Sequence, residues 1–210
     1  MDISVPASVD RNSSREQLLL AASELMAERE TIDISFSELA KKSGLNSALV
    51  KYYFGNKQGL LLALLEQILG PSLAQLEGLV TMDLDPESKI KMHVKAIISI
   101  YFRYPYINRL IHHLFGDPAS GQAVADSINR PLARSQRAIV EQGIAAGVVK
   151  DMDPMLFYHI VLGACDHIFF GKQILRIAFG IDAIDDKLRK TYTDSLLEIL
   201  MNGMLVSKSN

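Results

Sequence analysis

Tryptophan is absent from this 210-residue chain, and aromatic residues as a group make up only 7% of it. Hydrophobic residues still account for 49%, so Leu, Ile, Val, Ala and Met must fill the core. Such a core suits packed helices better than a sandwich of strands. Cysteine occurs once, at Cys165, which leaves no internal disulfide to expect and fits a reducing compartment.

An excess of positive charge is also missing, because the formal net charge is −2. A protein that only coats nucleic acid is usually strongly basic, so a DNA-binding surface here would have to be local. Apolar runs are short and interrupted by charge, and we therefore expect no membrane span. The start of the chain lacks the basic and apolar regions of a signal peptide, which favours a cytoplasmic protein.

Periodic apolar residues and capping signals predict an all-α fold. Residues 1–12 carry no periodicity and are expected to form a flexible arm. The helix that begins at Lys57 should continue through Pro71 with a kink, and Pro131 should kink or break a later helix. The helix after Pro154 is apolar nearly all round, so it should be buried. About nine helices are expected, over residues 13–30, 35–43, 47–54, 57–79, 85–104, 106–115, 121–146, 153–170 and 186–206.

The first three of these helices form a unit, 13–56, in which Gly44-Leu45 joins the second to the third. Two short helices with a glycine-containing turn make a helix-turn-helix, whose second helix reads bases in the major groove with its N-terminal residues. Ser47, Lys51 and Tyr52 are the best placed for that reading. Four lysines against one glutamate give residues 34–57 a local charge of +3, which would attract phosphates. On spacing alone, the same pattern also occurs in helical proteins that never bind DNA.

The string from Phe36 to Leu62 resembles the DNA-binding signature of the tetracycline-repressor (TetR) family. That signature has an alanine in the second helix, a glycine in the turn and an aromatic pair that ends in phenylalanine. A lysine follows three residues later, and apolar residues come after it. The motif covers about a quarter of the chain, while size, helical pattern and the stretch 147–154 are typical of the family but less specific. The matching residues are Ala40, Gly44, Tyr52, Tyr53, Phe54, Lys57 and Leu60.

The resemblance implies a role in DNA contact for several matched positions. Ser35 would cap the second helix and touch a phosphate. Asn46, Ser47 and Ala48 would face the groove at the start of the recognition helix. Lys57 would hold a phosphate, helped by the dipole of the fourth helix.

For Tyr52, Tyr53 and the preceding Lys51, the resemblance does not point to one single role. Tyr52 and Tyr53 would reach the DNA backbone or a thymine methyl, although packing against the first helix suits Tyr53 nearly as well. Many family members have an aromatic residue where this chain has Lys51. A lysine there can contact a base or a phosphate, so the operator preference of relatives does not transfer.

For residues 57–206 the resemblance implies effector binding and dimerisation. The last two helices carry small residues such as Gly163 and Gly203, which let helices approach closely. Two such helices from each protomer would form a four-helix homodimer interface. The alternative is that both helices bury against their own chain. An apolar seam for the interface could come from Leu188, Tyr192, Ile199 and Leu200.

Polar residues on otherwise apolar helices are the candidates for an effector pocket. Buried polar groups must be satisfied by something, and a ligand is one answer, while a neighbouring side chain or a water is the other. Several such residues together with aromatic walls predict a pocket. The candidates are His93, Tyr101, Arg109, His112, His113, His159, Asp166 and Phe169.

Signals for catalysis or metal binding are weak. The adjacent His112 and His113 would point about 100° apart on a helix, so they cannot easily share one ion. Glycine-rich phosphate loops and serine elbows are missing, and we expect no metal, no cofactor and no enzymatic activity. The sequence therefore predicts a homodimeric regulator, a repressor released from a palindromic operator by an unidentified small molecule. Two alternatives stay open: an all-α enzyme, and a structural helical dimer without operator recognition.

Overall fold

Helices dominate the described part of the chain, which is residues 11–206 of this computed structural model, with side chains from Ser14 onwards. Within that range the extended pairing is limited to a single antiparallel bridge, Val149 with Leu205. The elements in chain order are α1 (Arg11–Arg29), α2 (Phe36–Ser43), α3 (Ser47–Phe54), α4 (Lys57–Thr81), α5 (Pro86–Arg103), α6 (Ile107–Phe115), α7 (Pro118–Val124), the π-helical turn η1 (Ala125–Asn129), α8 (Arg130–Ala145), α9 (Pro154–Phe170), α10 (Lys172–Phe179) and α11 (Asp186–Met204).

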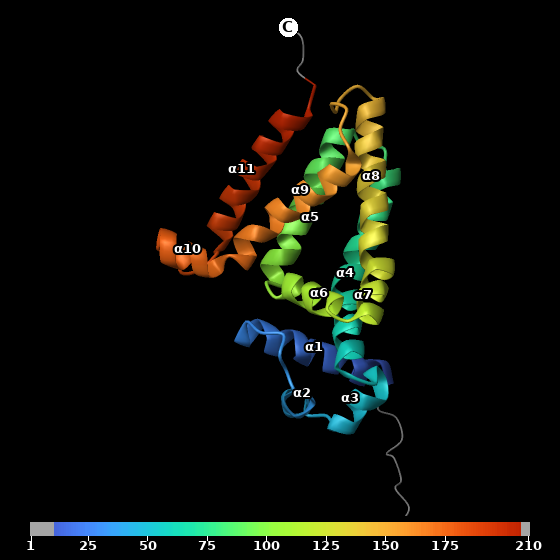
Figure 1. Ribbon diagram of the computed structural model, residues 1–210, viewed down its shortest axis with the longest axis vertical. Helices are drawn as coiled ribbons and strands as arrows, with labels where there is room; N and C mark the ends of the chain where they lie inside the picture. The colour runs from blue at the N-terminus through green and yellow to red at the C-terminus, as the bar shows by residue number, and fades with distance from the viewer. Residues whose placement is uncertain (1–10, 207–210) are drawn as a thin grey trace, which may run out of the picture.

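The molecule has a small N-terminal end and a larger helical body. α1–α3 form the lower end in Figure 1, and α4 rises from them into the body built by α5–α11. The all-α prediction, with an N-terminal helix-turn-helix unit, is confirmed. The arm expected over residues 1–12 lies outside the described residues up to residue 10, and residues 11–12 form the start of α1.

Helix starts in the N-terminal half follow the capping signals in the sequence. Ser35 and Glu38 form a reciprocal capping box at the start of α2. Asn56 caps α4 by accepting a hydrogen bond from the Gly59 backbone N–H at 2.8 Å. Each cap satisfies backbone N–H groups that have no partner inside the helix, which fixes where the helix begins.

α4 belongs to both parts of the molecule. It packs against α1 and α3 at one end and against α5, α6, α7 and α8 further along. The helix continues through Pro71 as expected, because a single missing N–H removes one hydrogen bond while the flanking leucines hold both halves in the core. A movement of α4 would therefore reach both parts.

By length and composition alone, α4 could cross a membrane, as could α9 and α10 taken as one bent pair. In α4 the apolar residues have another explanation, since Leu61, Leu65, Leu76 and Leu79 are buried against neighbouring helices. Its hydrophobicity is that of a core helix shared by two parts of the fold.

The helix expected over residues 121–146 is longer and less regular than predicted. It begins at Pro118, capped by Asp117, which accepts a hydrogen bond from the Ser120 backbone N–H at 2.9 Å. The π-helical turn η1 separates α7 from α8 and ends just before Pro131. Because Pro131 has no N–H to donate, the ladder is interrupted there, which fits the expected disturbance at this residue.

The expectation that the helix after Pro154 is buried all round is wrong. α9 buries Phe157, Val161 and Cys165 on one face. On its other face Leu156 and Ile160 each keep 52% of their surface exposed. An apolar helix therefore lies open on one side of this chain.

α10 was not expected at all. The chain bends by 62° at Gly171 between α9 and α10, and α10 ends at Gly180, which adopts φ +67°. None of its residues is buried. The helix is amphipathic, but it is too short for its periodicity to separate it from a loop.

α11 begins at Asp186, as expected, and Asp185 caps it, its carboxylate accepting from the Leu188 backbone N–H at 2.7 Å. The apolar seam expected along it is divided. Leu200 is buried within its own chain, while Ile199 is 70% exposed. The Tyr192 hydroxyl donates to the Ala164 carbonyl on α9, so this side chain ties α11 to α9 of the same chain.

Candidate nucleic-acid interface and internal cavity

A shared apolar core holds α2 and α3 against α1 and α4. Leu39 on α2 and Val50 on α3 are fully buried in it, and Phe54 nearly so. Gly44, between the two helices, has φ +71°, a conformation in which any residue with a Cβ would be strained. The turn is therefore set locally, and the core fixes the angle at which α3 leaves it.

One face of α3 is left open by this packing. Ser47, Ala48, Lys51 and Tyr52 are all exposed, and Tyr52 exposes 68% of its surface. These positions recur at helical spacing, so they form a single outward stripe. Tyr53 is half-buried on the opposite side, next to the core.

Asn46 and Ser35 serve as helix caps. The Asn46 side-chain oxygen accepts from the Ala48 backbone N–H at 2.8 Å. The Ser35 hydroxyl accepts from the Glu38 backbone N–H at 3.2 Å and lies 2.7 Å from a Glu38 carboxylate oxygen. Both side chains are exposed, but Ser35 already holds the start of α2, and Asn46 holds the start of α3, the helix that carries the stripe.

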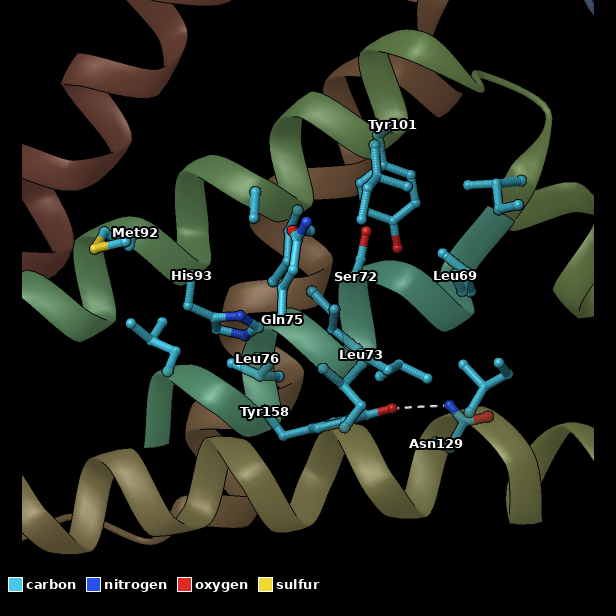
Figure 2. Close-up of a pocket in the computed structure, with 18 of the residues that line it drawn as sticks. Leu69, Ser72, Leu73, Gln75, Leu76, Met92, His93, Tyr101, Asn129 and Tyr158 are labelled. Atoms are coloured by element: carbon cyan, nitrogen blue, oxygen red, sulfur yellow. Dashed lines mark hydrogen bonds between the residues drawn. The ribbon is translucent and has the colours of Figure 1, made fainter. Parts of the chain in front are cut away.

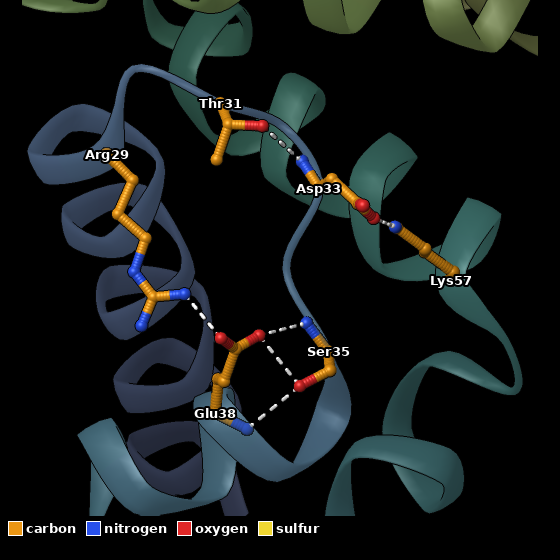
Figure 3. A network of polar contacts seen from close by, with 6 residues as sticks. All are labelled: Arg29, Thr31, Asp33, Ser35, Glu38 and Lys57. Carbon is orange, nitrogen blue, oxygen red and sulfur yellow. Dashed lines mark hydrogen bonds and ion pairs between the residues drawn. The ribbon is translucent and has the colours of Figure 1, made fainter.

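The surface formed by residues 34–57 carries less free positive charge than the count of +3 over these residues suggested. Lys42 pairs with Glu28 at 2.6 Å and with Glu24 at 3.5 Å, and Lys57 pairs with Asp33 (Figure 3). The three acidic partners lie outside residues 34–57, which is why a count over that window missed them. Among residues 14–206, Lys41 and Lys51 have no ion-pair partner, so the positive charge is concentrated on them.

Glu38 is also tied up by its neighbours. The pKa of its carboxyl falls to about 2, chiefly because Arg29 donates to it and then because the Ser35 backbone N–H and hydroxyl also donate. Figure 3 shows these contacts bringing the end of α1 to the start of α2. Ser35, Lys51 and Lys57 line one open hollow beside this network, together with the acidic residues Asp33 and Glu38.

A cavity of about 390 Å³ lies in the larger part of the molecule, lined by residues of α4, α5, α6, η1, α8 and α9 and partly open to solvent. Most of its lining is leucine, isoleucine and methionine. Figure 2 shows α4 side chains from Leu69 to Leu76 along one wall, with His93 and Tyr101 of α5 on another. The cavity has the size and the apolar character of a small-molecule site.

His93 and Tyr101 are the two expected pocket residues that line the cavity. The His93 Nε2 lies 2.6 Å from the Gln136 side-chain nitrogen, so the ring accepts a hydrogen bond from the amide. Burial lowers the pKa of His93 to about 4 and raises the pKa of Tyr101. Both side chains are therefore uncharged near neutral pH.

The other expected pocket residues lie elsewhere. His112, His113 and His159 are exposed. The first two lie on the solvent side of α6, whose apolar side faces the core, and His159 lies on the open face of α9 beside Ile160. Their spacing placed them on the right helices but could not show which face turns inward.

Three further candidates are engaged in contacts outside the cavity. Arg109 donates to the Glu30 backbone carbonyl at the end of α1. Asp166 accepts from the Asn108 side chain. Phe169 is buried behind Tyr101, with ring centroids 6.3 Å apart.

Sequence reasoning missed Asn129, which forms a polar pair with Tyr158 at one end of the cavity. The Asn129 side-chain nitrogen donates to the Tyr158 hydroxyl at 2.8 Å, and the other amide atom, Oδ1, is buried with no hydrogen-bond partner among the described residues. Asn129 lies just before Pro131, where the helix was expected to be disturbed. Ser72, a polar residue within the leucine stripe of α4, was a signal that could have located the α4 wall.

Two family profiles match the chain. The family described as "Bacterial regulatory proteins, tetR family" matches residues 18–64, which run from α1 into α4. The family described as "Tetracyclin repressor-like, C-terminal domain" matches residues 83–210, more than half of the chain.

Curated relatives agree with these profiles. The transcriptional regulator RutR of Escherichia coli K12 is 21% identical over 196 residues, 92% of this chain and 91% of its own length. The transcriptional regulator BetI of Stenotrophomonas maltophilia is 46% identical over 55 residues, but this match spans 26% of the chain and 28% of that protein.

Solved structures show the same fold. A TetR/AcrR-family regulator from Thermobifida fusca has a TM-score of 0.71 at 20% identity, covering 91% of this chain and 98% of that one. FadR from Bacillus subtilis, in complex with stearoyl-CoA, has a TM-score of 0.71 at 20% identity and covers 90% and 98%.

Proposed function

This chain belongs to the tetR family of bacterial regulatory proteins, and on that premise we propose that it is a homodimeric repressor that reads a palindromic operator with α3. A small molecule in the internal cavity would release it from DNA. The observation that carries the proposal is the outward stripe Ser47, Ala48, Lys51 and Tyr52 on a helix whose opposite side is fixed in the core.

The stripe suits a recognition helix because it joins donors, a cation and an aromatic ring on one face. A lysine can bind guanine or a phosphate, and apolar contact with a thymine methyl suits alanine or a ring. Lys41, Ser35 and Lys57 flank the stripe and would position the helix on the phosphate backbone. One copy of so short a helix reads few bases, so two copies about 34 Å apart are needed for a specific site.

Dimerisation through α9 and α11 would supply the second copy. On α9, Leu156, Ile160 and Gly163 are exposed at spacings of four and three, the pattern of helices that pack side by side. On α11, Ser195 and Ile199 are exposed in the same way. A twofold interface of this kind is self-complementary, which matches a palindromic operator.

Release by a ligand requires that the cavity and α3 be mechanically joined. α4 lines the cavity from Leu69 to Leu79 and packs against α3 at its start. Lys172 of α10 also pairs with Glu30 at the end of α1, at 2.8 Å. A ligand that favours one position of α4 would shift DNA affinity only through its differential affinity for the two states.

Because DNA is its target, we place the protein in the cytoplasm and assign it no catalytic role. Burial raises the pKa of the Cys165 thiol to about 12, so that group is protonated near neutral pH and is no nucleophile. The described residues contain no group of three or more His, Cys, Asp or Glu side chains able to hold a metal ion. Neither an enzyme nor a purely structural dimer has a specific observation in its favour.

Selection of bound duplexes from random DNA tests this function. The full chain is expected to enrich a palindrome whose half-sites lie one helical turn of DNA apart, or a multiple of it. A Val50→Asp variant, which disrupts the core under α3, serves as the unfolded control. Failure of the folded wild-type protein to enrich any sequence at moderate salt would contradict operator recognition.

A further inference from the structure

We propose that the cavity binds an uncharged, elongated and mainly apolar molecule whose hydroxyl group docks on Asn129 and Tyr158. This inference rests on the proposed function, because it identifies the chemical class of the effector. Its support is the shape of the cavity, the absence of charge in its lining and one incompletely bonded polar pair.

The cavity is long and narrow. Its lining extends from Leu69 on α4 to Met82 just beyond the end of that helix, and from Met92 to Tyr101 on α5. At 1.5 Å of rise per residue, these stretches span roughly 20 Å and roughly 14 Å. A volume of about 390 Å³ spread over such a length forms a narrow channel. For comparison, a rounded apolar cavity of roughly 150 Å³ holds benzene. An extended chain or a narrow ring system fits it.

No Asp, Glu, Lys or Arg lines this channel. The buried Lys89 lies outside the lining and donates to the Val80 carbonyl at 2.9 Å and to Gln142 at 3.0 Å. His93 accepts from Gln136 and is uncharged near neutral pH. A charged group on the ligand would lose its water and meet no counter-charge, which is costly in an apolar site.

The polar pair lies toward the Leu69 end of the channel, away from Met92 (Figure 2). The Asn129 amide donates to the Tyr158 oxygen at 2.8 Å, which leaves the tyrosine proton for another acceptor. The Asn129 Oδ1 has no partner among the described residues and needs a donor. One ligand hydroxyl can do both, because it donates to Asn129 and accepts from Tyr158.

Three probes of matched length separate charge from hydrogen bonding. 1-Decanol carries a hydroxyl, its isomer 1-methoxynonane carries an oxygen without a proton, and decanoate carries a charge at pH 7. Isothermal titration calorimetry with the full-length protein gives their affinities. We expect 1-decanol to bind at least about tenfold more tightly than decanoate and about fivefold more tightly than 1-methoxynonane.

Substitutions of the two cavity residues test where the hydroxyl of the ligand docks. Asn129→Leu should abolish the preference for 1-decanol over 1-methoxynonane, because only the alcohol can donate to Asn129. Tyr158→Phe should weaken the binding of both ligands, since the ether oxygen also accepts from Tyr158, whereas Tyr192→Phe, which removes a hydroxyl outside the lining, should leave both affinities unchanged. Retention of the preference in Asn129→Leu, or unchanged affinities in Tyr158→Phe, would overturn the assignment of the docking group.

Three outcomes would overturn the ligand class: no binding of 1-decanol up to its solubility limit, decanoate binding as tightly as 1-decanol, or stearoyl-CoA binding more tightly than either. A separate measurement tests the proposed function: the affinity of the protein for its selected DNA with and without 1-decanol. Tight 1-decanol binding that leaves DNA affinity unchanged would support the ligand class and contradict ligand-controlled repression.

Discussion

At the start of α4, Asp33 would compete with a DNA phosphate for the ammonium group of Lys57. Lys57 is held by Asp33, whose side chain is 88% exposed, and the hydrogen bond from Lys57 lowers the pKa of the aspartate. An exposed pair of this kind is weak, so a phosphate can displace the carboxylate. The carboxylate nevertheless adds negative charge where the DNA backbone would lie.

Asp33→Asn should therefore strengthen DNA binding. Removing the charge frees Lys57 and lessens repulsion, and we expect an increase of about two- to fivefold in affinity at low salt, together with a steeper salt dependence. Fluorescence anisotropy of labelled duplex measures both. Asp83→Asn makes the same change in net charge in the loop between α4 and α5 and should have little effect. Equal gains in the two variants would indicate a long-range charge effect and remove Lys57 from the interface.

His93 makes stability depend on acidity. Its pKa is about 4 in the folded chain because of burial, against about 6.5 when unfolded. Since the folded value is the lower one, the stabilisation is complete above about pH 6.5 and is lost as the pH falls toward 4, by up to about 3 kcal/mol. Urea unfolding across this window should show a shallower decline for His93→Gln than for wild type. His113→Gln, at an exposed site on α6, should follow wild type, and identical slopes in all three proteins would show that His93 is not the group responsible.

The C-terminal end of α4 is held by side chains of α5 and α8, at the junction of these three helices. The Val80 carbonyl lies in the last turn of α4, where no helical N–H remains to bond it. Lys89 of α5 donates to it at 2.9 Å, and Gln142 of α8 donates at 3.1 Å. Gln142 also accepts from Lys89 at 3.0 Å, which helps to offset the burial of the ammonium group.

Gln142→Leu should lower the free energy of unfolding by about 2 kcal/mol, because it leaves a buried lysine with one acceptor fewer. Chemical denaturation followed by circular dichroism gives this value. Gln67→Leu makes the same change at an exposed position on α4 and should stay within about 0.5 kcal/mol of wild type. A loss as small for Gln142→Leu would mean that the junction is not held by this network.

Local signals predicted the elements well, and tertiary packing explains what they missed. Ser35, Asn46, Asn56 and Asp85 each cap the helix that the sequence assigned to them, because a cap depends only on residues within one turn. The cavity lining depends on how six elements rotate against one another, so single polar residues could not locate it. α10 escaped prediction because its 8 residues are too few for their periodicity to separate a helix from a loop.

Taken as a whole, the molecule leaves two of its apolar surfaces open, and only one of them is proposed as the dimer interface. Ile160 on α9 and Ile199 on α11 expose 52% and 70% of their surfaces, and Ile177 on α10 exposes 78%. Burying a charge in a helix-packed interface is strongly unfavourable. Each of these isoleucines therefore offers a test by replacement with glutamate.

Ile160→Glu and Ile199→Glu should convert the dimer to monomer at micromolar concentration, whereas Ile177→Glu should leave it dimeric. Light scattering coupled to size-exclusion chromatography measures the mass, and circular dichroism checks that each variant is folded. Monomers produced by Ile177→Glu alone would move the interface to α10. A wild-type protein that is already monomeric would contradict the dimer.

The account depends most on the claim that the outward stripe of α3 carries sequence recognition. Equilibrium titration of the selected operator and of a scrambled duplex, at two salt concentrations, measures the specificity ratio directly. Lys51→Ala and Tyr52→Ala should each lower that ratio about tenfold, since they remove contacts to bases. Lys41→Ala should weaken both duplexes alike and reduce the salt slope by about one. If the ratio stayed unchanged in the Lys51 and Tyr52 variants, α3 would not be the element that reads DNA.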